Sequence, residues 1–454
     1  MPKDWKVGHI SAIFKKGNRH LSANYRPVSL TSIVCKVMEA IIRDKLMNHL
    51  LLHGLSDHQH GFVHGRSCTL QLLTALNQWT EMLDNGQPID VVYMDFAKAF
   101  DSVPHERLLQ KLSAYGISGC LLSWIRDFLT ERTQRVVVDG AESGWKNVIS
   151  GVPQGSVLGP VLFLIYINDL PDVITSSVKI FADDTKVFGN ANSDSEVTIL
   201  QRDIDALAAW SYSWQLPFNV QKCKVMHLGY RNQMQDYKLN GIPLQSVSNE
   251  KDLGIVIDSE LNFHLQTAQI VAKSFKMLGI IKRSFEKLDE ETVPLLFKSV
   301  IRPILEYGNC VWGPMYKGDQ DAVEKVLRRT TKLVKTIRQL PYEERLNKLG
   351  LMSMYYRRNR GDMIMTHQIL TGNIRFKRED IFTMSDTTRT RGHCLKLQKP
   401  QVSSLLRQHS FPVRVVNPWN SLPEYVTSAP TVNTFKNRLD KHWHYKRHKV
   451  RPIE

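Results

Sequence analysis

The sequence predicts an α+β fold in which a mixed region of strands and helices precedes a mainly helical, basic region. Short runs of apolar and β-branched residues alternate with amphipathic helices as far as about residue 262. Beyond that point, apolar residues recur at helical spacing among lysines and arginines, as in IVAKSFKMLGIIKRSF. The chain of 454 residues is long enough for more than one domain.

The composition is that of a globular protein with an unusual charge. The chain carries 60 Lys and Arg against 44 Asp and Glu, which favours a polyanionic partner. Its six cysteines are never in a CxxC pair, so we expect reduced thiols rather than a zinc knuckle or a disulfide framework. The N-terminus has no signal core, and the apolar run Val161 to Ile167 is too short for a membrane span. We therefore expect a protein of the nucleus or cytoplasm, neither secreted nor in a membrane.

The first predicted elements are a basic hairpin and an amphipathic helix. WKVGHISAIFKKGN alternates apolar and polar residues and ends in a loop at Lys15, Lys16 and Gly17. From Thr31, apolar residues recur at helical spacing until Gly54 ends the helix. We expect the apolar stripe of this helix to pack on a core; it comprises Ile33, Val34, Val37, Met38, Ile41, Ile42 and Leu46.

Two strand ends and a buried helix follow. DVVYMDFAKAF begins as an apolar strand that ends at Asp95, and KIFADDTKVF predicts a hairpin with Asp183 and Asp184 at its tip. Between them, GVPQGSVLGPVLFLIYI is a glycine-bounded loop leading into an apolar helix, which is therefore buried. Ser193 and Glu196 predict a capping box for the next helix.

The three aspartates require an explanation because like charges gather there in apolar surroundings. Two carboxylates about 4 Å apart repel each other by roughly 4 kcal/mol near a protein surface, so a cation should lie between them. If the strands ending at Asp95 and Asp183 are neighbours, the carboxylates meet at one edge and can hold two Mg²⁺ ions, or Mn²⁺ instead. Two such ions activate a hydroxyl and stabilise a leaving pyrophosphate. A polar surface turn is the alternative interpretation of the hairpin.

Five motifs follow one another along the chain: VVYMDFAKAFDSV, GVPQGSVLGPVLF, KIFADDTKVF, FNVQKCKVMHLG and EKDLGIVID. Together they closely resemble the reverse transcriptases of non-LTR (LINE-type) retrotransposons, most of all the jockey and CR1 branch. Upstream, FKKGN, NYRPVSL and QHGFVHGRSC resemble the finger motifs of that family. The resemblance implies a right-hand polymerase with fingers, an antiparallel palm sheet and a helical thumb. It also implies an RNA-directed DNA polymerase that extends a primer 3′-OH with dNTPs on an RNA template.

The resemblance assigns roles to residues near the aspartates. Asp95 and Asp183 match the metal-binding aspartates, and Asp184 matches the second position of the pair, either a ligand or a support for the primer end. Phe100 matches the aromatic gate that excludes a ribose 2′-hydroxyl, with a core phenylalanine as the alternative. We also predict that Phe96 contributes to nucleotide binding.

The resemblance also assigns roles to residues in the predicted loops and in the N-terminal hairpin. Gln154 and Gly155 match the loop that packs on the templating base pair, where glycine permits close approach. The finger residues that grip the triphosphate are matched by Lys15, Lys16 and Arg26, and the motif does not say which lysine does so. Lys222 matches a lysine proposed as general acid toward pyrophosphate; a solvated surface lysine is the alternative.

The resemblance also divides the chain into regions. Fingers and palm would occupy residues 1–250, with a primer grip at Lys251 to Gly254 and a helical thumb in 251–330. The thumb would track the duplex through Lys273, Lys276, Lys282 and Arg283, for which a solvated helix face is the alternative. Residues 331–454 form a helical, basic region of unknown role.

One departure from the family bears on activity. Its members usually carry an apurinic-type endonuclease before the polymerase, whereas this sequence starts almost at the finger hairpin. We therefore expect a truncated copy or a fragment, unable to perform target-primed insertion alone. The alternatives to a working polymerase are a non-catalytic RNA-binding remnant and a maturase-like protein of a group II intron. Metal-dependent incorporation of dNTPs would separate the polymerase from the remnant.

Overall fold

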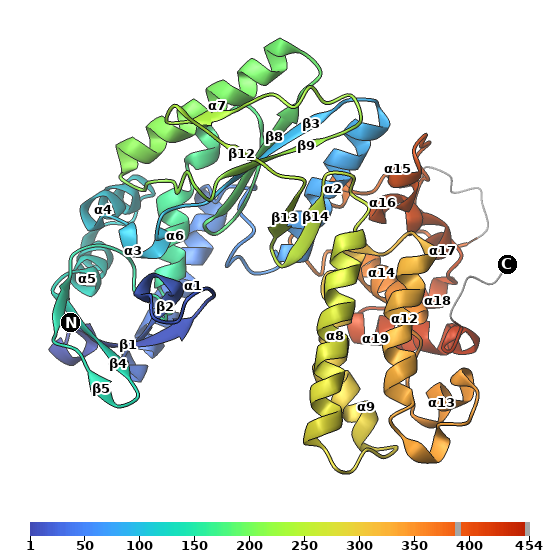
Figure 1. The fold of residues 1–454 in the computed structure, drawn as a ribbon. Helices are drawn as coiled ribbons and strands as arrows, with labels where there is room; N and C mark the ends of the chain where they lie inside the picture. Colours follow the sequence, from blue (N-terminus) through green and yellow to red (C-terminus); the bar gives the residue numbers. More distant parts are fainter. Residues whose placement is uncertain (386–391, 450–454) are drawn as a thin grey trace. The chain divides into compact units, whose positions relative to one another are not determined.

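The computed structural model describes residues 1–385 and 392–449, which form two compact units (Figure 1). Unit 1 comprises residues 1–63, 90–225 and 233–246, and unit 2 comprises residues 64–89, 226–232 and 247–454. Within the described ranges, no helix combines the length and apolar character that crossing a membrane requires.

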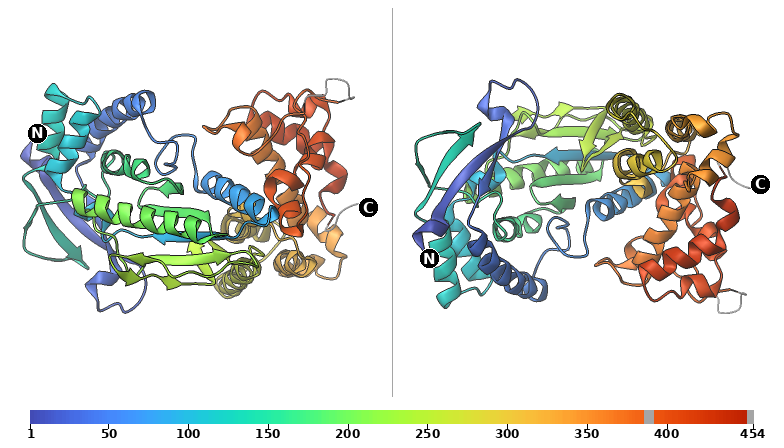
Figure 2. Two further views of the ribbon diagram at one scale, coloured as in Figure 1. Left: turned by 90° about the horizontal axis from the view of Figure 1, so that it is seen from above. Right: turned by 90° about the horizontal axis from the view of Figure 1, so that it is seen from below.

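A five-stranded central sheet carries the predicted aspartates. Its strand order is β12-β9-β3-β8-β7. The strands are β3 (Ile89–Met94), β7 (Ser177–Phe181), β8 (Asp184–Asn190), β9 (Lys224–Leu228) and β12 (Gln245–Ser246). Helix α7 (Asp194–Trp214) lies across one face of this sheet (Figures 1 and 2). It is capped by Ser193, whose hydroxyl accepts from the Glu196 N–H and donates to the Glu196 carboxylate, so the predicted N-cap is confirmed.

A second sheet in unit 1 contains the predicted N-terminal hairpin. Its strands are β1 (Val7–Phe14), β2 (Tyr25–Leu30), β4 (Arg132–Val138), β5 (Ala141–Glu142) and β6 (Lys146–Val148). β1 and β2 pair in an antiparallel register from His9 and Leu30 to Phe14 and Tyr25, and β1 pairs with β4 in parallel. Lys15 and Lys16 therefore follow β1 directly, at the end of the ladder.

The remaining helices of unit 1 fill the space beside the sheets. They are α3 (Ala99–Ser102), α4 (His105–Ala114), α5 (Gly119–Leu129) and α6 (Gly159–Ile167), and a small hairpin is formed by β10 (Lys238–Leu239) and β11 (Ile242–Pro243). Every residue of α6 except Pro160 is buried, which confirms the prediction of a buried apolar helix.

Helix α1 is present, but it buries a different face from the one predicted. It spans Ile33–His53, is capped by the Ser32 side chain and ends at Gly54. The side chains it buries are Cys35, Glu39, Ile42, Leu46 and Leu50. Most of the predicted core stripe is instead exposed, namely Ile33, Val34, Val37, Met38 and Ile41. At 3.6 residues per turn the two groups lie on nearly opposite sides. The prediction was wrong because α1 is apolar on both sides and only one side is covered within unit 1.

Unit 2 is mainly helical, as predicted for the chain beyond about residue 262. It contains α2 (Cys68–Asp84), the hairpin of β13 (Asn249–Asp252) and β14 (Ile255–Asp258), and the longer helices α8 (His264–Ser284), α12 (Lys317–Thr331), α14 (Met354–Leu370) and α19 (Val432–His442). Its shorter helices are α9 (Thr292–Leu296), α10 (Arg302–Glu306), α11 (Asn309–Trp312), α13 (Tyr342–Lys348), α15 (Leu405–His409), α16 (Phe411–Arg414), α17 (Val416–Asn420) and α18 (Glu424–Thr427). α8 and α12 lie side by side (Figure 1).

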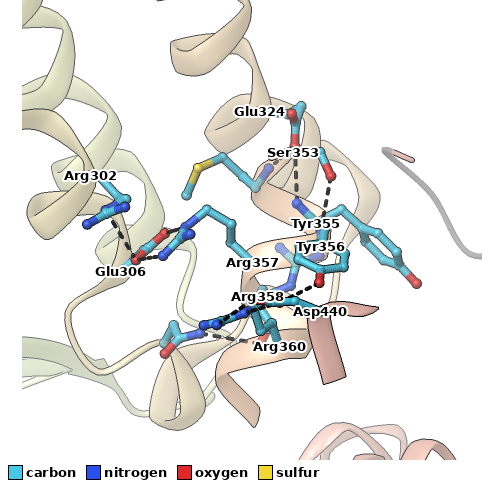
Figure 3. Close-up of polar contacts among 12 residues, drawn as sticks. Arg302, Glu306, Glu324, Ser353, Tyr355, Tyr356, Arg357, Arg358, Arg360 and Asp440 are labelled. Carbon is cyan, nitrogen blue, oxygen red and sulfur yellow. Dashed lines mark hydrogen bonds and ion pairs between the residues drawn. The ribbon is translucent and has the colours of Figure 1, made fainter. Parts of the chain in front are cut away.

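Charged side chains on α14 join it to three other helices (Figure 3). Arg357 forms a two-pronged ion pair with Glu306 of α10, with Nη2 2.8 Å from Oε2. Arg360 donates to Asp440 of α19 through Nε at 2.6 Å and Nη2 at 2.8 Å. The buried Glu324 of α12 accepts the backbone N–H of Met354 at 2.9 Å. Elements on both sides of residue 330 therefore share one polar network.

Candidate active site

Asp95 and Asp183 lie where neighbouring strands of the central sheet end. Asp95 directly follows β3, and Asp183 lies in the turn between β7 and β8. β3 and β8 are adjacent in the sheet. The negative charge of Asp95 contributes to raising the pKa of Asp183, so the two carboxylates lie within electrostatic reach of each other.

Asp184 is placed differently from the prediction that both aspartates form the tip of the hairpin. Phe181 pairs with Asp184, so the turn consists of Ala182 and Asp183, and Asp184 is the exposed first residue of β8. Ala182 adopts a φ of 54°, the left-handed conformation of a tight two-residue turn. Among the described residues, no three His, Cys, Asp or Glu side chains gather as a metal site. The structure therefore brings Asp95 and Asp183 together, and the predicted role of Asp184 stays a prediction.

The surroundings of Asp183 disfavour its charge. Burial raises the pKa of the Asp183 carboxyl above its ordinary value, and the charge of Asp95 raises it further. Two carboxylates in such surroundings favour a cation between them, and carboxylate oxygens are the ligands that Mg²⁺ prefers. The donor set of Asp95 and Asp183 therefore fits a divalent metal ion.

Two basic residues of the N-terminal hairpin act on the same carboxyl. The charges of Arg26 and Lys15 oppose the rise in the pKa of Asp183. Arg26 lies in β2 opposite Ile13, and the Lys15 N–H donates to the Asn24 carbonyl at 2.8 Å. The charge of Lys15 therefore acts on Asp183, and which of the two lysines contacts the triphosphate stays a prediction.

Lys222 lies against Asp95. Its Nζ is 2.8 Å from Asp95 Oδ2, and the lysine side chain remains mostly exposed. The backbone fixes this arrangement because the Asn219 N–H donates to the Asp95 carbonyl at 2.7 Å and the Lys222 N–H donates to Asn219 at 2.9 Å. A side chain far away in sequence thereby supplies a positive charge and a proton donor beside the carboxylate.

The two phenylalanines after Asp95 differ in their surroundings. Phe96 is buried and stacks on Phe218 with ring centroids 4.4 Å apart. Phe100 is half-buried and stacks on Phe163 at 4.4 Å, which holds its ring in one orientation. Phe100 thus keeps an accessible edge, whereas Phe96 lies in the core; the assignment of both to nucleotide binding stays a prediction.

The loop of Gln154 and Gly155 is attached to the structure on both sides. Gln154 Nε2 donates to Asp101 Oδ1 at 2.8 Å, and its carbonyl accepts the Ser29 N–H at 2.7 Å. Gly155 has a φ of 107°, and a Cβ there would lie 2.5 Å from the Ser29 carbonyl oxygen. Glycine is therefore required twice, by its backbone conformation and by its approach to β2.

Comparison with known proteins decides the family. A family model described as reverse transcriptase (RNA-dependent DNA polymerase) matches residues 13–281. The chain belongs to this reverse transcriptase family. It is 32% identical over 351 residues to the RNA-directed DNA polymerase from mobile element jockey of Drosophila melanogaster, an alignment covering 72% of this chain and 38% of that protein. It is 28% identical to a probable RNA-directed DNA polymerase from transposon BS of the same species, covering 75% and 39%.

The chain spans about two-fifths of the length of these curated relatives. Among solved structures, apo telomerase from Candida tropicalis is similar with a TM-score of 0.45 and 10% identity, over 76% of this chain and 62% of that one. Members of the reverse transcriptase family have a right-hand polymerase fold and use divalent metal ions.

In unit 2, the segment predicted as the primer grip is a tight hairpin. Leu253 and Gly254 form the turn between β13 and β14, with φ values of 44° and 89°. The Tyr307 hydroxyl donates to the Leu253 carbonyl at 2.8 Å and supports this turn. The basic residues predicted for the thumb are all exposed on α8; they are Lys273, Lys276, Lys282 and Arg283.

Sequence reasoning missed two acidic residues near the candidate site. Asp101 accepts from Gln154, and Glu39 holds the backbone that follows Gly155. A signal for Glu39 was available, because its i+4 spacing from Cys35 and i−3 spacing from Ile42 place an acid on an apolar helix face. A buried carboxylate of this kind requires a hydrogen-bond partner.

Proposed function

We propose that this chain is an RNA-directed DNA polymerase of a non-LTR retrotransposon. It would extend a primer 3′-OH with dNTPs on an RNA template, using two Mg²⁺ ions. The observation that carries the proposal is the half-buried Asp183 near Asp95, with the charges of Lys15 and Arg26 acting on it. Carboxylates for metal and cations for a triphosphate thus occur in one place, as phosphoryl transfer requires.

Each residue has a distinct role in this mechanism. Asp95 and Asp183 would hold the metal ions, which when bound lower the pKa of the primer hydroxyl and stabilise charge on the leaving pyrophosphate. Lys15 and Arg26 would bind the triphosphate through charge-assisted hydrogen bonds. The Lys222 ammonium would donate a proton to the pyrophosphate. Phe100 would exclude a ribose 2′-hydroxyl by steric contact, and Asp184 would support the primer end.

The proposal also assigns regions and partners. Fingers and palm occupy residues 1–250, and the primer grip and thumb occupy 251–330, with an RNA template and a DNA primer as partners. The exposed basic residues of α8 support contact with phosphates. All six cysteines are free, which fits a reducing compartment such as the nucleus or cytosol.

Primer extension on poly(rA)/oligo(dT) tests the proposal. We expect the purified chain to incorporate dTTP with Mg²⁺ and not with EDTA. Asp183→Asn should abolish incorporation, whereas the matched neighbour Asp184→Asn should retain part of it, because Asp184 is exposed on β8. Retained incorporation by Asp183→Asn would overturn the metal role.

The same preparation tests the alternative of a non-catalytic remnant. A remnant would bind the template with strong salt dependence and yield no metal-dependent product. Template binding without incorporation, from a wild-type chain shown to be folded by circular dichroism, would favour the remnant over the polymerase.

A further inference from the structure

Glu39 is a carboxylate buried in the middle of α1, with no exposed surface. Its Oε2 accepts two backbone hydrogen bonds, from the Val157 N–H at 2.7 Å and the Leu158 N–H at 2.9 Å. These two amides directly precede α6, which begins at Gly159. A charged acceptor at a helix N-terminus satisfies amides that the helix itself cannot pair. Glu39 therefore anchors the end of the loop that carries Gln154 and Gly155.

The loop is also bonded at Gly151 to Val103 and His105, and its remaining contacts include residues of the candidate site. At its beginning, the Val152 N–H donates to the carbonyl of Phe100 at 2.7 Å. In its middle, Gln154 is held by Ser29 and Asp101. The loop is thus suspended between the predicted sugar gate, strand β2 and Glu39. Only the Glu39 anchor is a buried charge.

The loop 151–158 has little room to move against β2. Gly155 approaches β2 so closely that a single added Cβ would lie 2.5 Å from a backbone oxygen. Without the Glu39 carboxylate, the amides of Val157 and Leu158 would be buried and unpaired, which the structure can relieve only by moving the loop. Such a movement would displace Gln154 and Gly155 together.

We propose that Glu39 is a positioning residue for nucleotide binding. It acts through the loop 151–158 by holding Gln154 and Gly155 against the nascent base pair, and it does not itself touch the nucleotide. This inference rests on the proposed polymerase function. It assigns a role in dNTP affinity to a residue of helix α1.

A matched control exists within unit 1. Asp203 of α7 is also buried, and its Oδ2 accepts two consecutive backbone amides, Thr175 at 3.0 Å and Ser176 at 2.6 Å. Those amides lie before β7 and not in the nucleotide loop. Asp203→Ala therefore removes the same kind of buried anchor, with a comparable loss of stability, from a segment outside the candidate site.

Steady-state primer extension distinguishes the two anchors. We expect Glu39→Ala to raise the KM for dTTP by roughly ten- to a hundredfold, as misplacement of a substrate-positioning group does, with a smaller change in kcat and in the KM for primer-template. Glu39→Gln, which keeps an acceptor oxygen, should restore most of the affinity and guards against misfolding of the alanine variant. Asp203→Ala should leave the KM for dTTP unchanged. Equal effects of Glu39→Ala and Asp203→Ala on that KM would overturn the proposal.

Amide hydrogen exchange supplies a measurement independent of activity. Glu39→Ala should accelerate exchange in 151–158 and leave 175–176 unchanged, Glu39→Gln should do so to a smaller extent because it keeps an acceptor oxygen, and Asp203→Ala should do the reverse. If wild type incorporates no dTTP, the polymerase function fails, while exchange still decides whether Glu39 holds the loop. Unchanged exchange in 151–158 would overturn the positioning role whatever the activity.

Discussion

At the candidate site the chain keeps Asp183 near Asp95, in surroundings that disfavour the charge of Asp183. Burial and mutual repulsion both raise the pKa of Asp183, and one described counter-charge, Lys222, lies directly on Asp95. Such an arrangement lowers the stability of the protein, and proteins retain it where function requires it. The motifs were sufficient to predict this pair, because the residues are contiguous with strand ends. They could not predict Glu39, whose partners lie more than a hundred residues away.

Replacing Asp183 with Asn should therefore stabilise the metal-free protein while abolishing polymerisation. The amide carries no charge to desolvate, so we expect a rise of a few degrees in the melting temperature in EDTA. Mg²⁺ should raise the melting temperature of wild type and leave that of Asp183→Asn unchanged, because binding stabilises only a folded state that can bind. An equal Mg²⁺ response from both proteins would contradict the assignment of Asp183 as a ligand.

At Lys222, charge and proton donation can be separated. Lys222→Arg keeps a cation beside Asp95, but a guanidinium does not release its proton, whereas Lys222→Gln removes both properties. If Lys222 is a general acid, single-turnover incorporation should slow in both variants by roughly a hundredfold; recovery in Lys222→Arg would instead indicate a purely electrostatic role. The stability of either variant should stay within about 1 kcal/mol of wild type, because the pair is largely exposed.

At the scale of elements, the sequence predicted which helices and hairpins are present better than it predicted which of their residues are buried or form the turn. The bounds of α1 follow from the Ser32 cap and Gly54, but its two apolar stripes left the buried side undecided. The hairpin of β7 and β8 was predicted with its turn displaced by one residue, because Asp183 and Asp184 are equally good turn formers. Only pairing of Phe181 with Asp184 distinguishes them, and that pairing depends on packing of the β8 side chains.

The two faces of α1 should respond oppositely to substitution. Leu46 is 1% exposed, so Leu46→Ala should lower the free energy of unfolding by about 2 to 5 kcal/mol. Val37 is 61% exposed, and Val37→Ala should change it by less than about 0.5 kcal/mol. Urea denaturation followed by circular dichroism measures both. A large loss of stability in Val37→Ala would show that the exposed stripe is covered in the protein in solution.

At the scale of the whole molecule, the order of strands in the central sheet could not be predicted from the sequence. Motif order along the chain does not reveal that β3 lies between β8 and β9, because pairing is settled by contacts between distant segments. The same limit applies to residues 331–454. Their composition predicted helices, whereas their place within unit 2 depends on an ion pair to α10 and a backbone hydrogen bond to α12 (Figure 3). The boundary at residue 330 stays a prediction.

Unit 2 should lose stability in mild acid. Burial lowers the pKa of His367 below its ordinary value of 6.5, and its Nε2 lies 3.1 Å from the Ala429 carbonyl. The folded state disfavours the protonated ring. The stability that the neutral His367 ring contributes is therefore complete above pH 6.5 and is lost as the pH falls below that value. The unfolding midpoint of unit 2 should therefore decrease as the pH is lowered from about 7 to about 5. It should decrease less steeply in His367→Gln. A midpoint that rises in this window would contradict the prediction.

Truncation after residue 330 should unfold the proposed thumb. It would remove Arg357 from Glu306 and would deprive the buried Glu324 of the Tyr342 hydroxyl and the Met354 and Tyr355 amides. The apolar surface of α12 toward α13 and α14 would be exposed to water, and the lost burial and hydrogen bonds both destabilise the helix. Hydrogen exchange in α8 and α12 of residues 1–330 should therefore approach that of an unfolded chain.

The point variant Arg357→Met provides the matched comparison for this truncation. It breaks one ion pair to α10 and keeps every contact of Glu324, so it should accelerate exchange at Glu306 and leave α12 protected. If residues 1–330 retained protected α8 and α12 helices, the thumb would be an independent unit and the C-terminal region an appendage. If α12 lost protection in the truncated chain alone, residues 331–454 would be a structural part of the thumb, and their basic side chains would move with the duplex-binding surface.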